Sequence, residues 1–418
     1  MRRLRGRAVL VVAALVTSAL ALGMTPGRLT TGAEEGLRTA PGYRTAAATA
    51  AGPTSDELAW LASGTVPGAG TRWADMARWA LLDLRAFQSP AGSVAAGPGG
   101  PWGYFWPRDG SFAAVAFAVT GHATEAARVL DRLARLELDP AVGFQARYTL
   151  DGTALTDRPP QSDGCGWVLW ALDSVRRSDP AALPSSARGL RDRCVGVLTR
   201  LVRDGQRLPP PSPDYWELPV GEVSLGTVAP VLAGLVAGAA YLDATGEQGT
   251  AARVRGAAEA LGSLTMRELG PRFERFGDHG GYDAAVAMLL PPVLPAGLLP
   301  AGTLELVGAA RDAYQRGAAQ PAGGVAPGSR WVKHDGASWT PQTALLALTD
   351  ATTGRAEPAG KWLDWLDRHR TAYGSLPEKV TRSGRPAGPA PLTWTASLVL
   401  LALHELEGAA PSASLPGR

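Results

Sequence analysis

The chain has few residues that bind metals. Among its 418 residues there are only two cysteines and five histidines. Two cysteines cannot complete a closed zinc site alone, and the histidines are scattered without a close pair, so zinc chemistry is not expected. The chain also lacks the Asp-Asp-rich cluster that a helical enzyme of isoprenoid chemistry needs for magnesium and diphosphate. That class of enzyme is therefore disfavoured.

The chain also lacks an excess of charge of either sign. Its formal charge is +3, and four of its arginines, at positions 2, 3, 5 and 7, precede an apolar run. Removal of residues 1–21 takes away those four arginines and no acid, which brings the charge to about −1. Without a basic stripe, neither nucleic acid nor an anionic membrane is an expected partner. A neutral, diffusible substrate fits better.

One apolar run, Ala8 to Leu22, follows the arginines and is too short to span a bilayer comfortably. With the small residues around Ala19-Leu20-Ala21 it predicts a signal peptide over 1–21, and thus a secreted protein without stable membrane insertion after cleavage. A retained membrane anchor is the alternative. Residues 22–53 are small and without sustained period, which predicts a linker or flexible leader. We expect one domain over 54–408 and a tail over 409–418.

Convincing β alternation is scarce, whereas helical periodicity recurs along the whole domain and predicts an all-α fold. Eleven or twelve helices joined by Gly/Pro-bearing loops favour helical pairs closed into a double ring; an open array is the alternative, but no fixed repeat supports it. Cys165 and Cys194 could form a disulfide after export, or equally remain two buried thiols. The predicted helices cover 72–88, 110–120, 123–137, 161–177, 186–204, 221–243, 249–268, 302–316, 339–353, 358–370 and 391–407.

Four loops combine aromatic, acidic and arginine residues. The first, Trp102 to Gly110, places Trp106 beside the pair Arg108-Asp109. Aromatic faces stack on sugar rings, and the charged pair offers fixed donors and acceptors to vicinal hydroxyls. A structural salt bridge next to core tryptophans would explain the same pattern. In the second loop, Asp163 falls in the first turn of a predicted helix, where an aspartate is commonly only a cap.

The third and fourth loops carry the candidate catalytic acids. Glu217 follows Tyr215 and Trp216, and desolvation by these aromatics would raise its pKa, as a proton donor requires. Glu378 lies on a more polar loop with Lys379 adjacent, which favours an ionised carboxylate that takes a proton from water. Either glutamate alone could be an ordinary surface acid. The order of the four loops along the chain supports a catalytic role for both glutamates.

As an ordered set, the four loops resemble those of glucoamylases, glycoside hydrolase family 15. Trp-Pro-Arg-Asp resembles the family's Trp-x-Arg-Asp, Arg-Pro-Pro-Gln-Ser-Asp-Gly its Arg-Pro-Gln-x-Asp-Gly, and Tyr-Trp-Glu the Trp-Glu of its catalytic acid. Gly-Ser-Leu-Pro-Glu378, followed by Leu-Thr-Trp394, resembles its catalytic-base loop and the helix after it. The loop Gly-Ser-Arg330-Trp331 resembles a further sugar-binding arginine loop. The resemblance covers residues 72–407.

This resemblance implies a six-hairpin (α/α)6 barrel with its site at one mouth, an inverting mechanism, and no metal or organic cofactor. Glu217 would be the general acid and Glu378 the general base. The enzyme would release terminal glucose from α-linked oligo- or polysaccharides. We expect it to be a single-domain monomer. Substrate would be bound by Trp106, Arg108, Asp109, Asp163, Trp216, Arg330 and Trp394.

Three departures from the family pattern leave the linkage and the activity open. Leu218 stands where fungal glucoamylases have a second glutamate, Trp102 stands where a tyrosine hydroxyl is expected near the base, and Lys379 replaces a common glutamine. The alternatives are a glucosidase of the same family for trehalose or isomalto-oligosaccharides, and a non-catalytic sugar-binding protein.

Overall fold

The computed structural model describes residues 37–38, 46–300 and 302–409. The chain divides into Met1–Glu34 and Glu35–Arg418, and all described residues belong to the second part. The signal peptide expected over 1–21 lies outside the described residues, as do the first part of the expected leader and residues 410–418 of the expected tail.

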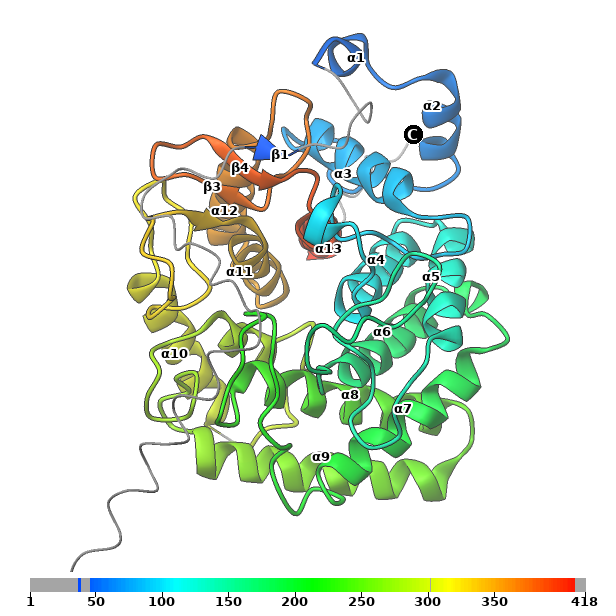
Figure 1. Cartoon of the computed structure of the whole chain (residues 1–418), viewed down its shortest axis with the longest axis vertical. Coiled ribbons are helices and arrows are strands. Elements are labelled where there is room, and N and C mark those ends of the chain that lie inside the picture. The colour runs from blue at the N-terminus through cyan, green and yellow to red at the C-terminus, as the bar shows by residue number, and fades with distance from the viewer. Residues whose placement is uncertain (1–36, 39–45, 301, 410–418) are drawn as a thin grey trace, which may run out of the picture. The chain divides into compact units, whose positions relative to one another are not determined.

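The described residues form two concentric rings of helices (Figure 1). Each inner helix contacts the next, and the last contacts the first, so the inner ring closes. Its members are buried on almost every side, which explains why their sequences read as apolar all round. In chain order they are α4 (Pro107–Val119), α6 (Gly164–Ser178), α8 (Leu225–Ala244), the 3-10 helix η3 (Ala284–Leu289), α11 (Thr340–Thr352) and α13 (Thr393–Ala409).

The outer helices alternate with the inner ones along the chain and are amphipathic. In α5, for example, Ala126, Val129, Leu130 and Leu133 face the core at helical spacing. Each outer helix packs mainly on one inner helix: α3 on α13, α5 on α4, α7 on α6, α9 on α8, α10 on η3 and α12 on α11. Their bounds are Ala74–Phe87 (α3), Ala123–Arg135 (α5), Ala187–Leu201 (α7), Gln248–Leu269 (α9), Thr303–Gly317 (α10) and Ala356–Arg368 (α12).

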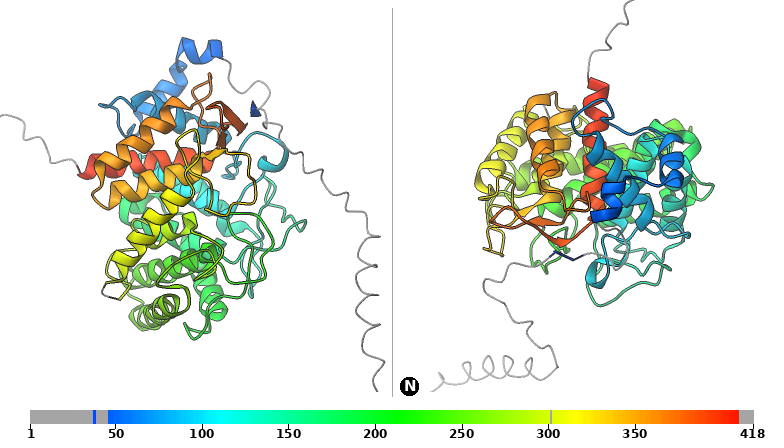
Figure 2. Two further views of the ribbon diagram at one scale, coloured as in Figure 1. Left: turned by 90° about the vertical axis from the view of Figure 1, so that its left-hand side faces the viewer. Right: turned by 90° about the horizontal axis from the view of Figure 1, so that it is seen from above.

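This arrangement is the six-hairpin (α/α)6 barrel that we expected, and all eleven predicted helices are present within a few residues of the predicted bounds. The views in Figure 2 place the red helix α13 beside the orange helices α11 and α12, in agreement with their contacts. The prediction missed η3, the remaining inner element, and the short helix α2 (Ser55–Ala62). Both are too short to give a helical period.

Short strands, which the sequence did not indicate, form a four-stranded sheet in the order β1-β4-β3-β2. The strand β1 is parallel to β4, and the other pairs are antiparallel. The sheet matters for the site because β3 begins at the residue after Glu378. Its strands are β1 (Leu37–Arg38), β2 (Ser338–Trp339), β3 (Lys379–Val380) and β4 (Pro386–Pro389); the remaining short elements are α1 (Ala46–Ala51) and the 3-10 helices η1 (Gly100–Trp102) and η2 (Pro180–Ala182).

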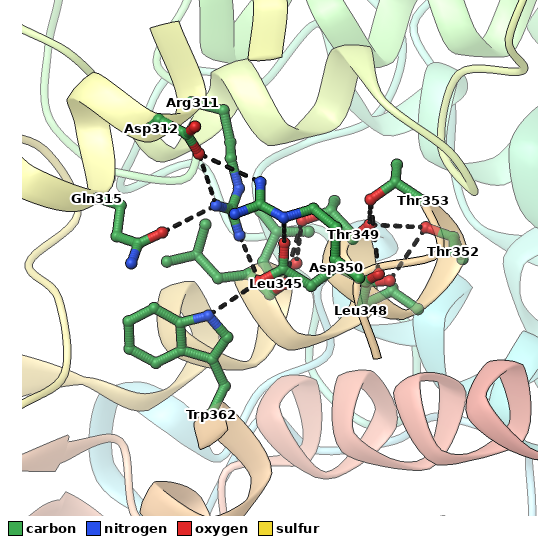
Figure 3. A network of polar contacts seen from close by, with 12 residues as sticks. Arg311, Asp312, Gln315, Leu345, Leu348, Thr349, Asp350, Thr352, Thr353 and Trp362 are labelled. Atoms are coloured by element: carbon green, nitrogen blue, oxygen red, sulfur yellow. Dashed lines mark hydrogen bonds and ion pairs between the residues drawn. The ribbon is translucent and has the colours of Figure 1, made fainter. Parts of the chain in front are cut away.

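A buried polar network ties three helices together at the C-terminal end of α11 (Figure 3). The carboxylate of Asp350 on α11 lies 2.5 Å from Arg311 of α10 and accepts a hydrogen bond of 3.0 Å from the indole of Trp362 on α12. Burial raises the pKa of Asp350, although Arg311 and Arg355 oppose the shift. A buried charge without its partner is strongly destabilising. The network therefore links α10 and α12 to α11 through Asp350.

Candidate active site

The sequence-predicted site residues gather at the N-terminal ends of the inner helices. Pro107 occupies the first turn of α4, where its missing N–H costs nothing, and places Arg108 and Asp109 in that turn. Asp163 immediately precedes α6. Trp394 lies in the first turn of α13. Because neighbouring inner helices contact each other side by side, these chain positions converge although they are far apart in sequence.

Arg108 is the centre of the first group of contacts. Its guanidinium is buried, lies 3.0 Å from Asp109 and 3.4 Å from Glu217, and stacks 4.6 Å from the ring centre of Trp394. A second guanidinium, that of Arg158, lies 2.8 Å from the other oxygen of Glu217. Burial raises the pKa of Asp109, and Arg108 opposes this shift. Glu217 is therefore held between two arginines, with 23% of its side chain exposed.

These contacts correct one expectation. Tyr215 and Trp216 do not form an apolar enclosure for Glu217, because both aromatic side chains are occupied elsewhere. The hydroxyl of Tyr215 donates to Asp283 at 2.5 Å, and Trp216 stacks 3.8 Å from the guanidinium of Arg275. The aromatic neighbours thus support the loop, and Glu217 itself faces Arg108 and Arg158.

Asp214 shapes the loop that presents Glu217. Its backbone carbonyl accepts the N–H of Glu217 at 2.8 Å, and its carboxylate accepts from the N–H of Trp216 and the hydroxyl of Ser224. Glu217 has φ +57°, in the left-handed region that glycine prefers. A non-glycine residue stays in that region only where its surroundings fix it, and the hydrogen bonds of Asp214 do so here.

Arg275 joins Asp214 to a second buried acid. Its guanidinium lies 2.7 Å from Asp214 and 2.8 Å from Asp283, and all three side chains are buried. Neither Arg275 nor Asp283 was predicted to be a site residue. Both lie in a glycine-rich loop without period, so no helical pattern marked them. Arginines and acids are concentrated in residues 272–283, and this composition could have marked the loop as a candidate site. It does not show which arginine pairs with which acid.

Asp163 is buried within the same group, and burial raises its pKa to about 7 even though Arg108 and a hydrogen bond from Trp167 oppose the shift. Its carboxylate accepts from the indole of Trp167, one turn into α6, at 3.0 Å. It makes no side-chain cap with the helix N-terminus, so the ordinary capping interpretation does not hold. Asp163 is a buried acid behind Arg108.

We predict that Asp163→Asn makes stability less dependent on pH. The folded-state pKa of Asp163 lies above its ordinary value of 3.8, so the folded protein binds the extra proton, and stability falls as pH rises from about 4 to about 7. This group contributes at most about 1.4 kcal/mol per pH unit. Urea unfolding at pH 4.5 and 7.0 should give a smaller difference for the variant than for the parent. Equal differences would contradict the prediction.

Glu378 is buried beside two cationic or donor groups. The indole N–H of Trp102 donates to its Oε1 at 3.0 Å, and the ammonium of Lys379 lies 3.4 Å from its Oε2. Its backbone N–H donates to the carbonyl of Pro389 at 2.8 Å. Two departures from the glucoamylase pattern are thus explained: Trp102 supplies a donor where a hydroxyl was expected, and Lys379 supplies a charge.

One segment contacts both glutamates. Trp102, at its start, donates to Glu378, and Arg108, at its end, lies against Glu217. The stretch between them leads from η1 into α4. The two carboxylates are far apart in sequence, and each contacts a residue of this short segment.

Tryptophans line the other side of the group. Trp216 packs edge-on against Trp331 with ring centres 4.7 Å apart, and Trp331 packs in the same way against Trp339 at 5.2 Å. The ammonium of Lys379 lies 4.9 Å from the ring centre of Trp339. A row of aromatic rings therefore connects the Glu217 loop with the Glu378 loop. Trp106 is buried and packs against Tyr104.

Arg330 differs from the other arginines of the site because it is exposed. Within the part of the chain that the structure describes, its guanidinium forms no ion pair or hydrogen bond. The N–H of Ser329 before it donates to the carbonyl of Tyr282, and Trp331 after it belongs to the tryptophan row, so its loop is fixed on both sides. Arg330 is available to bind a ligand.

Leu218 and the two cysteines lie apart from the contacts of the two glutamates. Leu218 is partly buried and packs against the core. Cys165 and Cys194 are buried free thiols, the second of the two states expected for them. Among the described residues, no group of three or more histidines, cysteines and acids is placed to hold a metal ion.

Known proteins with the same fold support the resemblance drawn from the motifs. No family model matches the chain. An isomaltose glucohydrolase of Kribbella flavida is 27% identical over 386 residues, which cover 81% of this chain and 94% of that protein. A solved glycosidase has a TM-score of 0.68 at 23% identity, covering 85% of this chain and 99% of its own. The glucoamylase of Saccharomycopsis fibuligera has a TM-score of 0.62 at 15% identity, with coverage of 85% and 96%. The chain has a glucoamylase-like (α/α)6 fold.

Proposed function

We propose that this chain is an exported, monomeric, exo-acting hydrolase that releases terminal glucose from α-linked glucosides with inversion of configuration. The observation that carries the proposal is the segment from Trp102 to Arg108, which contacts both Glu217 and Glu378. Inverting hydrolysis needs two carboxyl groups on opposite faces of one sugar. Contacts of both glutamates with one short segment support their assignment to such a pair.

Similarity to known proteins supports the reaction class, hydrolysis of glycosidic bonds. The chain is a glycoside hydrolase: a relative aligned over most of both chains is an isomaltose glucohydrolase, and proteins with the same fold are a glycosidase and glucoamylases. One structure of that glycosidase is a complex with glucose. These names support glucosides as the substrate class.

In the proposed reaction, the carboxyl group of Glu217 gives its proton to the glycosidic oxygen as the bond from that oxygen to the anomeric carbon breaks. On the opposite face of the sugar, Glu378 takes a proton from a water whose oxygen bonds to the same carbon. The products are β-glucose and the leaving alcohol. The indole N–H of Trp102 and the ammonium of Lys379 fix the orientation of the Glu378 side chain for this role.

The surrounding residues bind the sugar in this proposal. Arg108 and Asp109, locked to each other, offer a fixed donor and acceptor for vicinal hydroxyls. Arg330 adds an unpaired donor at the edge of the site. Trp106, Trp216 and Trp394 contribute aromatic surface, and Asp163 supports Arg108 from behind.

A preference for α-1,6 linkages is the second candidate. It is favoured by the name of the aligned relative and by Leu218, which replaces with an apolar side chain the second glutamate that the resemblance to fungal glucoamylases leads one to expect. An apolar side chain cannot hydrogen-bond a leaving sugar as a carboxylate does. The ratio of kcat/KM for isomaltose and maltose distinguishes this candidate from a starch-end enzyme.

The decisive experiment uses the mature protein from residue 22 with maltose, isomaltose, trehalose and longer α-glucans. Proton NMR during the first turnovers should show β-glucose before mutarotation forms the α anomer, and no internal fragments. Early α-glucose would contradict inversion, and internal fragments would contradict an exo mode. Absence of product from every α-glucoside would overturn the proposed function.

A further inference from the structure

The segment that precedes the barrel pairs with the residues that hold Glu378. The strand β1 adds to the edge of the sheet and runs parallel to β4, with Leu37 opposite Gly388 and Arg38 opposite Pro389 (Figure 1). The strand lies within residues 22–53, which we expected to be a linker or flexible leader. At Leu37 and Arg38 that expectation is wrong, because these residues form a strand. Backbone pairing needs no side-chain pattern, so this strand could not be predicted from the sequence.

The two residues of β4 that pair with β1 are the ones that touch the base. The carbonyl of Pro389 accepts the N–H of Glu378 at 2.8 Å. A Cβ atom on Gly388 would lie only 2.7 Å from Oε2 of Glu378, so its backbone is in close approach to the carboxylate. The position of Glu378 therefore depends on the position of β4.

A second contact connects the leader to the other side of the base loop. In α1, the hydroxyl of Thr49 donates to the carbonyl of Tyr373 at 3.0 Å. Tyr373 lies in the turn closed by hydrogen bonds between Thr371 and Ser375, just before Glu378. The leader thus contacts the chain both before and after the base, at two points that are independent of each other.

We propose that β1 and α1 are positioning elements of the catalytic site, which hold Glu378 where it can deprotonate water. This inference rests on the proposed function. The helical rings begin with α3, and the helix α2 before it is capped by Thr54 and bound through the indole of Trp60 to Glu125 of α5. A chain without β1 therefore keeps its helical rings, and the loss is expected in catalysis rather than in folding.

The test compares mature chains that begin at residue 22, 35 and 46. The chains from 22 and 35 keep β1 and should have equal kcat. The chain from 46 should lose about tenfold to a hundredfold in kcat with little change in KM, because a small misplacement of a reacting group has effects of this size. The loss should be equal for an α-glucoside and for α-glucosyl fluoride, whose leaving group needs no acid but whose hydrolysis still needs the base.

Variants of the mature chain from residue 22 test the same role if the chain from residue 46 fails to fold. Leu37→Pro with Arg38→Pro removes the backbone donors of β1, and Leu37→Ala with Arg38→Ala, the matched control, keeps them. The proline variant should reproduce the loss in kcat, and the alanine variant should not. Unchanged kcat in the proline variant, or an equal loss in both, overturns the positioning role. If the mature chain from residue 22 cleaves no α-glucoside, the proposed function fails instead.

Discussion

Glu217→Gln should lower kcat/KM for an ordinary α-glucoside by about a hundredfold to ten-thousandfold, the range that a general acid contributes. Arg108 and Arg158 contact the two different oxygens of Glu217, at 3.4 and 2.8 Å. Glutamine keeps the shape of the side chain, but its single amide oxygen can accept from only one of these arginines, and it has no acidic proton to give. Hydrolysis of α-glucosyl fluoride should fall far less, because fluoride departs without protonation. Steady-state kinetics with both substrates measures the difference.

The matched control for this variant is Glu222→Gln. Glu222 lies on the same loop, five positions later, and is 61% exposed, with a contact to His279 that faces solvent. Its replacement should leave both rates unchanged. A Glu217→Gln protein that loses the two activities to the same extent would show that Glu217 is not the acid.

Glu378→Gln should lower kcat by a similar factor on both substrates, because the attacking water must lose its proton whichever group leaves. The neutral amide cannot accept that proton. It would also leave the ammonium of Lys379, buried 3.4 Å from Oε2, without its carboxylate. Removing one member of a buried pair costs about 3–5 kcal/mol. We therefore expect a lower melting temperature together with the lower rate, measured by calorimetry and kinetics on one preparation.

Azide separates these two effects in Glu378→Ala. This anion needs no deprotonation, so it should restore part of the rate and give the β-configured glycosyl azide, whereas a purely structural loss would not respond. Glu357→Gln serves as the control, because Glu357 is an exposed acid on α12 whose ion pair with Lys361 lies at the surface. Absence of rescue combined with a normal melting temperature would refute the base assignment.

The outer and inner helices were predictable because burial gives them a pattern. Outer helices such as α5 have one apolar face, and inner helices such as α8 are apolar all round, and both patterns are local in sequence. The elements that were missed depend on distant partners. η3 is a helix only where it packs between α8 and α11, and the strands near Glu378 are two to four residues long and exist through pairing.

The candidate site was predictable as a set of residues but less so as a set of environments. The order of the four loops identified Arg108, Glu217 and Glu378, and the structure brings their neighbourhoods together. The surroundings of Glu217 were inferred wrongly from adjacent residues, because Tyr215 and Trp216 turn toward Asp283 and Arg275. Proximity in sequence does not determine which side chains a loop residue meets when the loop is held from outside.

The left-handed backbone of Glu217 has a consequence for engineering. A non-glycine residue at φ +57° costs about 1–3 kcal/mol, and the hydrogen bonds of Asp214 maintain it. Glycine and asparagine occupy that region with less strain, so either one at position 217 would relieve the strain while abolishing proton donation. Directed evolution for heat tolerance alone would therefore favour inactive descendants at this position. Thermostable libraries of this protein need an activity screen at every round.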